Sequence, residues 1–566
     1  MGVEDAVAAG QAALARGRWD DARAAFAAAL ADGDVPEALD GLAEVCYWQG
    51  DYGGSIQLRE RAYAGFRARG ETRYPAVLAA YHLAFNYVAV HGNGAAASGW
   101  LERGKRLAEV SGDCAERGWV ALACALSAGD AEEKQRHVAT AMEIAKRFAD
   151  ADLEFDALAY TGVCQVERGQ IAAGMRRLDE AAAAVRGGEV KSFTVAGEIY
   201  CKMLVACEMV LDVRRAEEWA AIANALGGES DTAWVSAICR MYRGGILTAG
   251  GRWADAEAEL ETSIRIYDKS YRALRAGAVV RLADLRVRQG RLEEAAQLLA
   301  GNDHDLYAVR PLARLHLARD EVELAATLLR RHLRQYGAVV LQVPELALLA
   351  EVEAAAGRVD AVRAVCAQLT AIADRTQVPF LYAFAEFAAG LADRHSDAAA
   401  AIAHLEAALA AFRASGLPYE EARTRLLLAT LLSPAAPDVA IAEATTALAV
   451  FDRLGAGPDA NAAAALLRSL GARARTAPKG GDLLSKREQE VLHLLGLGLS
   501  NPEIATRLFI SRKTAAHHVS NVLTKLGLRN RAEAAAYASV HHVGQSGPPA
   551  QAGKRHPAHR GNDTSG

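Results

Sequence analysis

The stretch "GRWADAEAEL", residues 251–260, carries a pattern that returns along most of the chain. Counted from the glycine, a large side chain stands two residues later, a small residue five residues later and a large apolar residue nine residues later. Glycine can end one helix in a left-handed turn, and a small residue lets the next helix approach its partner closely. The pattern also starts at Gly17, Gly50, Gly169, Gly290 and Gly357, and in looser form at Asp320 and Ser396.

The segments before most copies have apolar residues at helical spacing. Examples are "ALDGLAEVCYWQ", which ends at Gln49, and "VVRLADLRVRQ", which ends at Gln289. The repeating unit is therefore a pair of helices. Gly17 and Gly50 are 33 residues apart, and later spacings are 39, 30 and 37 residues. Alternation of β-branched residues is almost absent, so we expect no sheet. An irregular all-α domain without true repeats is the alternative.

This unit resembles the tetratricopeptide repeat, whose period is about 34 residues. The resemblance implies an all-α fold: a tetratricopeptide-like helical-repeat solenoid over residues 1–470. A stacked solenoid has a concave face that can hold a peptide, a partner helix or a small molecule. The sequence is compatible with each of these occupants.

The composition is that of a soluble protein, with 52% hydrophobic and 23% charged residues. No uncharged apolar run reaches the ~18 residues that a membrane span needs, and no signal pattern opens the chain, so we expect a cytoplasmic protein. The eight cysteines are scattered without a Cys-x-x-Cys pair. We expect them to be buried thiols in a reducing compartment, with no metal or redox role.

No motif predicts an enzyme, a cofactor or a metal site. The segment "GWLERGKR", Gly99–Arg106, resembles a phosphate-binding loop, but Arg106 stands where that loop needs Ser or Thr. Its apolar residues also have helical spacing. The segment "NDHD", Asn302–Asp305, lies between predicted helices, where such residues serve as caps and turns.

Charge and composition both change near residue 471. Residues 1–482 carry 53 basic and 64 acidic side chains, whereas residues 483–543 carry 8 and 4. A large acidic body joined to a small basic end is expected where only the end contacts a polyanion. We therefore predict a repeat domain at 1–470, a linker at 471–482, a small helical domain at 483–543 and a disordered tail at 544–566.

The basic end contains clear helix signals. Ser485 with Glu488, Ser500 with Glu503, and Asn530 with Glu533 have the spacing of capping boxes. Ser511 is a plain N-cap, and Gly498 and Gly527 follow helix ends. The predicted helices are 486–496, 501–508, 512–526 and 531–541. Because only "FIS", residues 509–511, joins the second helix to the third, the domain is a small four-helix helix-turn-helix domain.

The third of these helices, in "SRKTAAHHVSNVLTKLG", residues 511–527, has two distinct faces. Its apolar side is predicted to bury against Leu492, Leu495, Ile504 and Leu508. That side consists of Ala515, Val519, Val522 and Leu526. The opposite side consists of Lys513, Ala516, His517, Ser520 and Thr524. Thr514, His518 and Lys525 lie on one flank, with Asn521 between that flank and the polar side.

The polar side has hydrogen-bonding and basic groups suited to the major groove of double-stranded DNA. His517 is the candidate for reading a base edge, with Ser520 beside it. The candidates for phosphate contacts are Arg512, Lys513, Thr514, Asn521 and Lys525. One or both histidines, His517 and His518, could instead serve packing or face solvent.

The segment "LSKREQEVLHLLGLGLSNPEIATRLFISRKTAAHHVSNVLTKLGLRNRAEA", residues 484–534, resembles the DNA-binding domain of LuxR-type transcriptional regulators. Residues that fit the family pattern include Arg487, Glu488, Ser500, Asn501, Glu503, Ile504, Thr514, His518, Asn521, Lys525, Gly527 and Arg531. Ala516 departs from the pattern, because the family often carries a base-contacting Lys there. The resemblance also implies that the alanine face of the last helix, "NRAEAAAYASVHH", pairs two copies on DNA.

The body resembles the helical repeats of the large ATP-binding LuxR-type regulators, through "GLPYEEARTRLLLATLL" at Gly416 and "ALAVFDRLGAGPDA" at Ala447. The resemblance implies a shorter architecture without their ATPase domain. We therefore expect a bacterial transcriptional regulator that binds DNA as a homodimer, while its repeats bind a protein or small-molecule signal. The alternative is a helical-repeat interaction scaffold whose DNA binding has degenerated.

Overall fold

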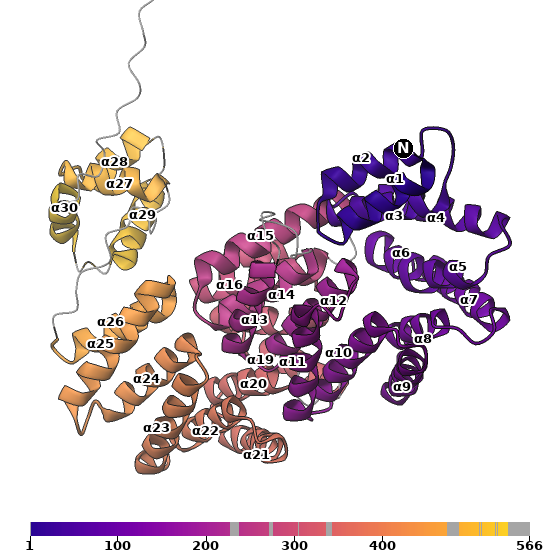
Figure 1. The fold of residues 1–566 in the computed structure, drawn as a ribbon. Coiled ribbons are helices and arrows are strands. Elements are labelled where there is room, and N and C mark those ends of the chain that lie inside the picture. The colour runs from indigo at the N-terminus through magenta and orange to yellow at the C-terminus, as the bar shows by residue number, and fades with distance from the viewer. Residues whose placement is uncertain are drawn as a thin grey trace, which may run out of the picture. The chain divides into compact units, whose positions relative to one another are not determined.

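The computed structural model describes residues 2–540, apart from residues 227–236, 271–274, 304, 336–341, 473–485, 509, 511, 527 and 529. The chain forms two compact units, Met1–Leu470 and Gly471–Gly566 (Figure 1). Ser485, Ser511 and Gly527, for which we predicted capping roles, lie outside the described residues, as does the predicted tail.

The first unit is built from helices that follow one another with short connections. Its first half contains α1 (Val3–Leu14), α2 (Trp19–Ala29), α3 (Pro36–Trp48), α4 (Tyr52–Ala68), α5 (Arg73–Val77), the π-helical turn η1 (Leu78–Leu83), α6 (Ala84–His91), α7 (Gly94–Val110), α8 (Glu116–Ser127), α9 (Ala131–Phe148), α10 (Ala151–Glu167), α11 (Ile171–Gly187), α12 (Phe193–Met209) and α13 (Val213–Leu226). Its second half contains α14 (Ala237–Ala249), α15 (Trp253–Ser270), α16 (Arg275–Gln289), α17 (Leu292–Leu299), η2 (Leu306–Ala308), α18 (Val309–Ala318), α19 (Val322–Gln335), α20 (Val343–Ala355), α21 (Val359–Thr376), α22 (Pro379–Asp393), α23 (Ala398–Ala414), α24 (Pro418–Leu432), α25 (Pro437–Leu454) and α26 (Gly457–Ser469).

These helices stack as successive antiparallel pairs. Each pair packs its two members together, and from α8 to α22 the first helix of one pair contacts the first helix of the next (Figure 1). The described residues contain no strand. The predicted all-α helical-repeat solenoid is therefore confirmed. Among the described residues, no helix is both long and apolar enough to cross a membrane.

The glycines that mark the repeats end helices as predicted. All six copies of the pattern place their glycine in the left-handed region, with φ between 65° and 83°. A new helix starts two residues after each of these glycines. The two looser copies, at Asp320 and Ser396, are also followed by helices α19 and α23. The turn glycine is thus the local signal that sets the phase of the repeats.

Two of these glycines allow a direct comparison of backbone strain with packing. At Gly357 (φ 72°) an added Cβ would have nothing within 4 Å, whereas at Gly290 (φ 80°) it would lie 2.7 Å from Cδ of Pro458 at the start of α26. We expect Gly357→Ala to lower the free energy of unfolding by about 1 kcal/mol through strain alone. Gly290→Ala adds overpacking and is expected to cost about 2–3 kcal/mol. Denaturant unfolding of both variants tests this order, and equal losses would contradict it.

One prediction about the cysteines is wrong. Cys201 on α12 and Cys239 on α14 form a disulfide, with Cα atoms 5.3 Å apart, and are therefore not thiols. The other six cysteines are free. The pair is 38 residues apart in sequence and is brought together by the packing of two neighbouring first helices, which no local spacing reveals.

The two motifs that we judged noncatalytic have structural roles. "GWLERGKR" lies inside α7, where Gly104 packs closely against Ala76 and Ala80, and Lys105 pairs with Glu102 at 2.7 Å. In "NDHD", Asp305 accepts the backbone N–H of Tyr307 at 2.9 Å, so it caps a helical turn as predicted. Residue 304 lies outside the described residues.

The second unit contains the four predicted helices in a small bundle. They are α27 (Lys486–Gly496), α28 (Asn501–Leu508), α29 (Arg512–Lys525) and α30 (Arg531–Val540). The apolar side of α29 packs into one core with the residues we named, including Leu492, Leu495 and Ile504. Gly498 takes the left-handed conformation (φ 80°) after α27, as predicted.

Candidate nucleic-acid interface and a charged cavity

Helix α29 is held by one buried face. Ala515, Val519 and Val522, together with Leu526 directly after the helix, are all buried in one core with residues of α27 and α28. Because these four positions are spaced by three or four residues, the opposite side of the helix must face outward. The burial predicted for this helix is thus confirmed, and it determines which side chains a partner could reach.

The outward residues of α29 differ in exposure. Arg512, Thr514, Ala516 and Ser520 are exposed, while His518 and Asn521 are half-buried. Lys513, His517 and Lys525 belong to the helix, but their side chains lie outside the described part of the structure. The helix therefore presents a polar face from its first turn to its third.

Helix α28 is connected to α27 and to α30 by polar contacts whose roles we did not foresee. Arg487 donates to the carbonyl oxygen of Leu508, the last residue of α28, and pairs with Glu490 at 2.6 Å. Arg531 on α30 donates to Asn501 Oδ1 on α28 at 3.0 Å. Both arginines fit the family pattern, which was the available signal. They position the helix that precedes α29.

In two of the predicted capping boxes, one of the two reciprocal interactions is present among the described residues. The backbone N–H and the hydroxyl of Ser500 both donate to Glu503 Oε2 at 2.6 Å. The backbone N–H of Glu533 donates to Asn530 Oδ1 at 3.0 Å. Each bond satisfies one group at a helix start, and together they fix where α28 and α30 begin.

Part of the alanine face of α30 packs into the core of its own domain. Ala534 and Ala538 are buried in the core, and a Cβ at Gly496 would lie 2.7 Å from the Cβ of Ala538. Glycine at the end of α27 therefore lets α30 pack closely. Ala532, on the first turn of the same helix, is exposed.

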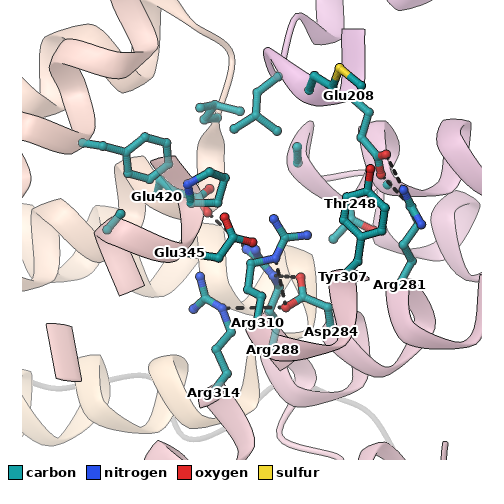
Figure 2. Close-up of a pocket in the computed structure, with 18 of the residues that line it drawn as sticks. Glu208, Thr248, Arg281, Asp284, Arg288, Tyr307, Arg310, Arg314, Glu345 and Glu420 are labelled. Atoms are coloured by element: carbon teal, nitrogen blue, oxygen red, sulfur yellow. Dashed lines mark hydrogen bonds and ion pairs between the residues drawn. The ribbon is translucent and has the colours of Figure 1, made fainter. Parts of the chain in front are cut away.

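The repeat unit contains a cavity of about 90 Å³ lined by charged side chains of five first helices and by Tyr307. Figure 2 shows the carboxylate of Asp284 on α16 at the centre of contacts from neighbouring arginines. Five arginines and five carboxyl groups line the cavity. These residues are Arg281, Arg288, Arg310, Arg314, Arg423, Glu208, Asp284, Glu345, Glu351 and Glu420.

Three of these arginines form close hydrogen-bonded pairs with carboxylates. Arg281 bonds Glu208 through two nitrogens at 2.7 and 2.6 Å, and Arg423 bonds Glu351 in the same way at 3.0 and 2.5 Å. Arg288 connects two carboxylates, Asp284 at 3.0 Å and Glu420 at 3.1 Å. The positive charges of the surrounding arginines outweigh the effect of burial and hold the pKa of Asp284 below its ordinary value.

A second cavity, of about 170 Å³, is lined by residues of α3, α4, η1, α6, α8, α12 and α14 and has aromatic walls that include Trp48 and Phe85. Its cations have acidic partners. Lys202 donates to Asp156 at 2.6 Å, and Arg59 pairs with Asp40 at 3.4 Å. The two cavities therefore differ in how far their positive charges are compensated.

A short helix, a tight connection and a second helix with a buried and a polar face define the second unit as a helix-turn-helix DNA-binding domain. Residues 482–538 match the family of bacterial regulatory proteins of the luxR type. This C-terminal part of the chain is a LuxR-family domain, as its sequence pattern predicted.

Curated relatives match a segment of similar length. The transcriptional regulatory protein LnrK of Bacillus subtilis is 52% identical over 54 residues, which is 10% of this chain and 24% of that protein. The oxygen regulatory protein NreC of Staphylococcus aureus is 48% identical over 56 residues, which is 10% of this chain and 26% of that protein. The chain thus spans about a quarter of the length of the curated relatives it matches.

Solved structures of low similarity align with most of the chain. The Cut9–Hcn1 hetero-tetramer of the APC/C has a TM-score of 0.34 and 14% identity, over 82% of this chain and 95% of that one. Yeast Tom70 has a TM-score of 0.29 and 12% identity, over 82% of this chain and 96% of that one.

Proposed function

We propose that this protein is a bacterial transcriptional regulator that binds double-stranded DNA through α29 and responds to a signal through its repeats. The observation that carries the proposal is the LuxR-family domain, in which one side of α29 is buried and the side with Arg512, Thr514, Ala516 and Ser520 is exposed. An exposed polar helix of this kind fits the major groove.

Within this proposal each outward residue has a role. His517 reads a base edge, assisted by Ser520, and Ala516 lies on the same groove-facing side. His518 lies on the flank. The phosphate contacts come from Arg512, Lys513, Thr514, Asn521 and Lys525, and they position the helix without reading sequence.

We further propose that two copies bind a two-half-site operator, with the outward side of α30 near Ala532 as the pairing surface. The excess of four positive charges in residues 483–543 supports DNA as the polyanion. The stacked first helices and the charged cavity among them support a signal-binding role for the repeats.

Replacing His517 with alanine is expected to reduce discrimination between bases by about 1–3 kcal/mol while nonspecific binding stays nearly unchanged. The reason is that a base contact distinguishes sequences, whereas phosphate contacts bind all of them. Titrations of the full chain on selected and scrambled duplexes measure both quantities. Lys513→Ala is the comparison, since a lost phosphate contact weakens binding uniformly and reduces the salt slope by about one. A uniform loss for His517→Ala would remove the base-reading role.

The whole proposal is tested by selection from a random DNA library with the full chain at one fixed salt concentration, because phosphate contacts make affinity salt-dependent. Enrichment of one motif is expected. A flat profile would favour the alternative, an interaction scaffold whose DNA binding has degenerated.

A further inference from the structure

The hydrogen bonds of the charged cavity leave two cations without a close partner. Arg310 and Arg314 lie one turn apart on α18, and their nearest carboxylate oxygen is Asp284 Oδ1, at 3.9 and 3.7 Å from the two Nε atoms. Neither distance is a hydrogen bond, and both Nε atoms are buried without a partner among the described residues. The paired arginines of the same cavity have their bonds at 2.5–3.1 Å.

The positive charges of this cluster also act on one another. Burial, followed by the charges of Arg288 and Arg423, lowers the pKa of Arg314, although Asp284 and Glu351 act in the opposite direction. Since Asp284 also bonds Arg288, one carboxylate faces three guanidinium groups. Arg310 and Arg314 are 23% and 14% exposed, but their Nε atoms are buried without a bonded partner, so an added negative group that accepts from them would be stabilised.

Glu345 on α20 is the fifth carboxyl group of the cavity, and no arginine hydrogen bond reaches it in the described structure. Its side chain is 5% exposed, and its Oε2 atom has no partner. Burial raises the pKa of Glu345, opposed mainly by Arg310. When Glu345 is protonated, five arginines face four carboxylates and the cavity carries one positive charge.

We propose that this cavity is a binding site for a small oxyanion, either inorganic or the phosphate or carboxylate group of a small molecule. Arg310 and Arg314 hold its oxygens through charge-assisted hydrogen bonds, and protonated Glu345 donates to it. The proposal rests on the signal-binding role of the repeats given above, and it names the chemical class of that signal.

The size of the cavity agrees with this class. One water molecule needs about 10–15 Å³ of cavity volume, so the cavity of about 90 Å³ holds roughly six to nine waters. A phosphate or carboxylate group replaces a few of these waters and leaves room for a short attached skeleton. Aromatic side chains line both cavities, so the charged cavity is distinguished from the cavity beside Trp48 by its incompletely paired arginines.

The experiment is isothermal titration calorimetry of the full chain with sodium sulfate and, separately, sodium acetate, at ionic strength held constant with chloride. Sulfate keeps its charge between pH 5 and 8, so its own titration does not enter. Saturable binding of either anion is expected. Tighter sulfate binding would indicate a phosphate-like ligand, and tighter acetate binding a carboxylate, both within the proposal.

The variants Arg310→Gln and Arg314→Gln should each weaken binding at least about tenfold, the loss expected when a charge-assisted hydrogen bond is removed. Each variant also removes a cation that faces the buried carboxylate of Asp284, so the thermal midpoint is measured for both, and affinity is compared at a temperature where the variant is folded. Arg214→Gln is the matched control, because that side chain is 82% exposed and lies outside the cavity.

Glu345→Gln separates an effect on binding from an effect on folding. It is expected to increase the affinity for the anion, and a folding defect would not do so. The groups that face Glu345 are Arg310 and Arg314 on α18, Asp284 and Arg288 on α16, Glu420 and Arg423 on α24, and Glu351 on its own helix. Wild-type affinity should rise as the pH falls, because protonation removes the repulsion between Glu345 and the anion. The neutral glutamine should bind sulfate more tightly than the wild type at pH 8 and flatten this dependence.

The proposal is overturned if no saturable heat appears, if Arg310→Gln and Arg314→Gln bind like the wild type, or if Glu345→Gln weakens binding. Its failure is distinguishable from failure of the proposed regulator. Enrichment of a DNA motif without anion binding removes only the anion site, whereas anion binding with a flat DNA selection removes only the regulator.

Discussion

Replacing Glu208 with leucine is expected to lower the free energy of unfolding of the repeat unit by about 3–5 kcal/mol, because it leaves the charge of Arg281 buried without its partner. Arg281 is 4% exposed, and its bidentate bond to Glu208 joins α16 to α12 across 73 residues of sequence. Burial by itself would lower the pKa of Arg281, but the carboxylate of Glu208 more than offsets this and raises it. Urea unfolding followed by circular dichroism measures the loss.

The double variant Glu208→Leu with Arg281→Met should recover most of this stability, since an apolar pair of similar volume replaces a buried ion pair at little cost. Asp255→Ala is the control. Asp255 pairs with Arg252 at 2.7 Å on the surface, where such a pair contributes about 0–1 kcal/mol. A double variant as unstable as Glu208→Leu would show that the contact of the ions with Tyr242 and Tyr307, and not the charge, is what matters.

Much of the fold could be predicted because its signals are local. The turn glycines, such as Gly17 and Gly357, need a left-handed backbone that other residues resist, so they mark helix ends in the sequence itself. Each helix of the second unit has an N-cap residue and a helical apolar period in the sequence, and Gly498 and Gly527 follow two of the helix ends. Its predicted helices therefore agree with the observed bounds to within a residue over the described range.

The charged cavity could not be predicted because its contacts are long-range. Arg423 and Glu351 are 72 residues apart, and Arg281 and Glu208 are 73 apart. In sequence, each looks like an ordinary charge on a solvated helix face. Only the stacking of first helices brings five arginines and five carboxyl groups to one place. The disulfide between Cys201 and Cys239 escaped prediction for the same reason.

The residues proposed to contact DNA lie between these two cases. The buried side of α29 followed from helical period alone, and this determined that Ala516 and Ser520 point outward. The contacts of Arg487 with Leu508 and of Arg531 with Asn501 did not follow, because they join separate helices. Their agreement with the family pattern is explained by the support they give to α28.

Leu495→Ala is expected to abolish DNA binding on every sequence alike, in contrast to His517→Ala. Leu495 is 0% exposed and packs in the core beneath α29 with Ile504 and Val519. Its truncation should cost about 2–5 kcal/mol, and a domain of this size holds only about 3–5 kcal/mol in total. Helix α29, the proposed recognition helix, then loses its support, so specific and nonspecific binding are expected to fall together. Hydrogen exchange over residues 486–540, alongside DNA titrations, measures both effects.

Leu497→Ala is the matched control from the same helix end. Its side chain is 58% exposed, so the substitution should change stability by no more than about 0.5 kcal/mol and leave DNA affinity unchanged. The repeat unit should keep its exchange protection in both variants, because it forms a compact unit of its own. If Leu495→Ala retained full affinity while exchange over 486–540 accelerated, the packed face of α29 would not be what presents its polar face to DNA.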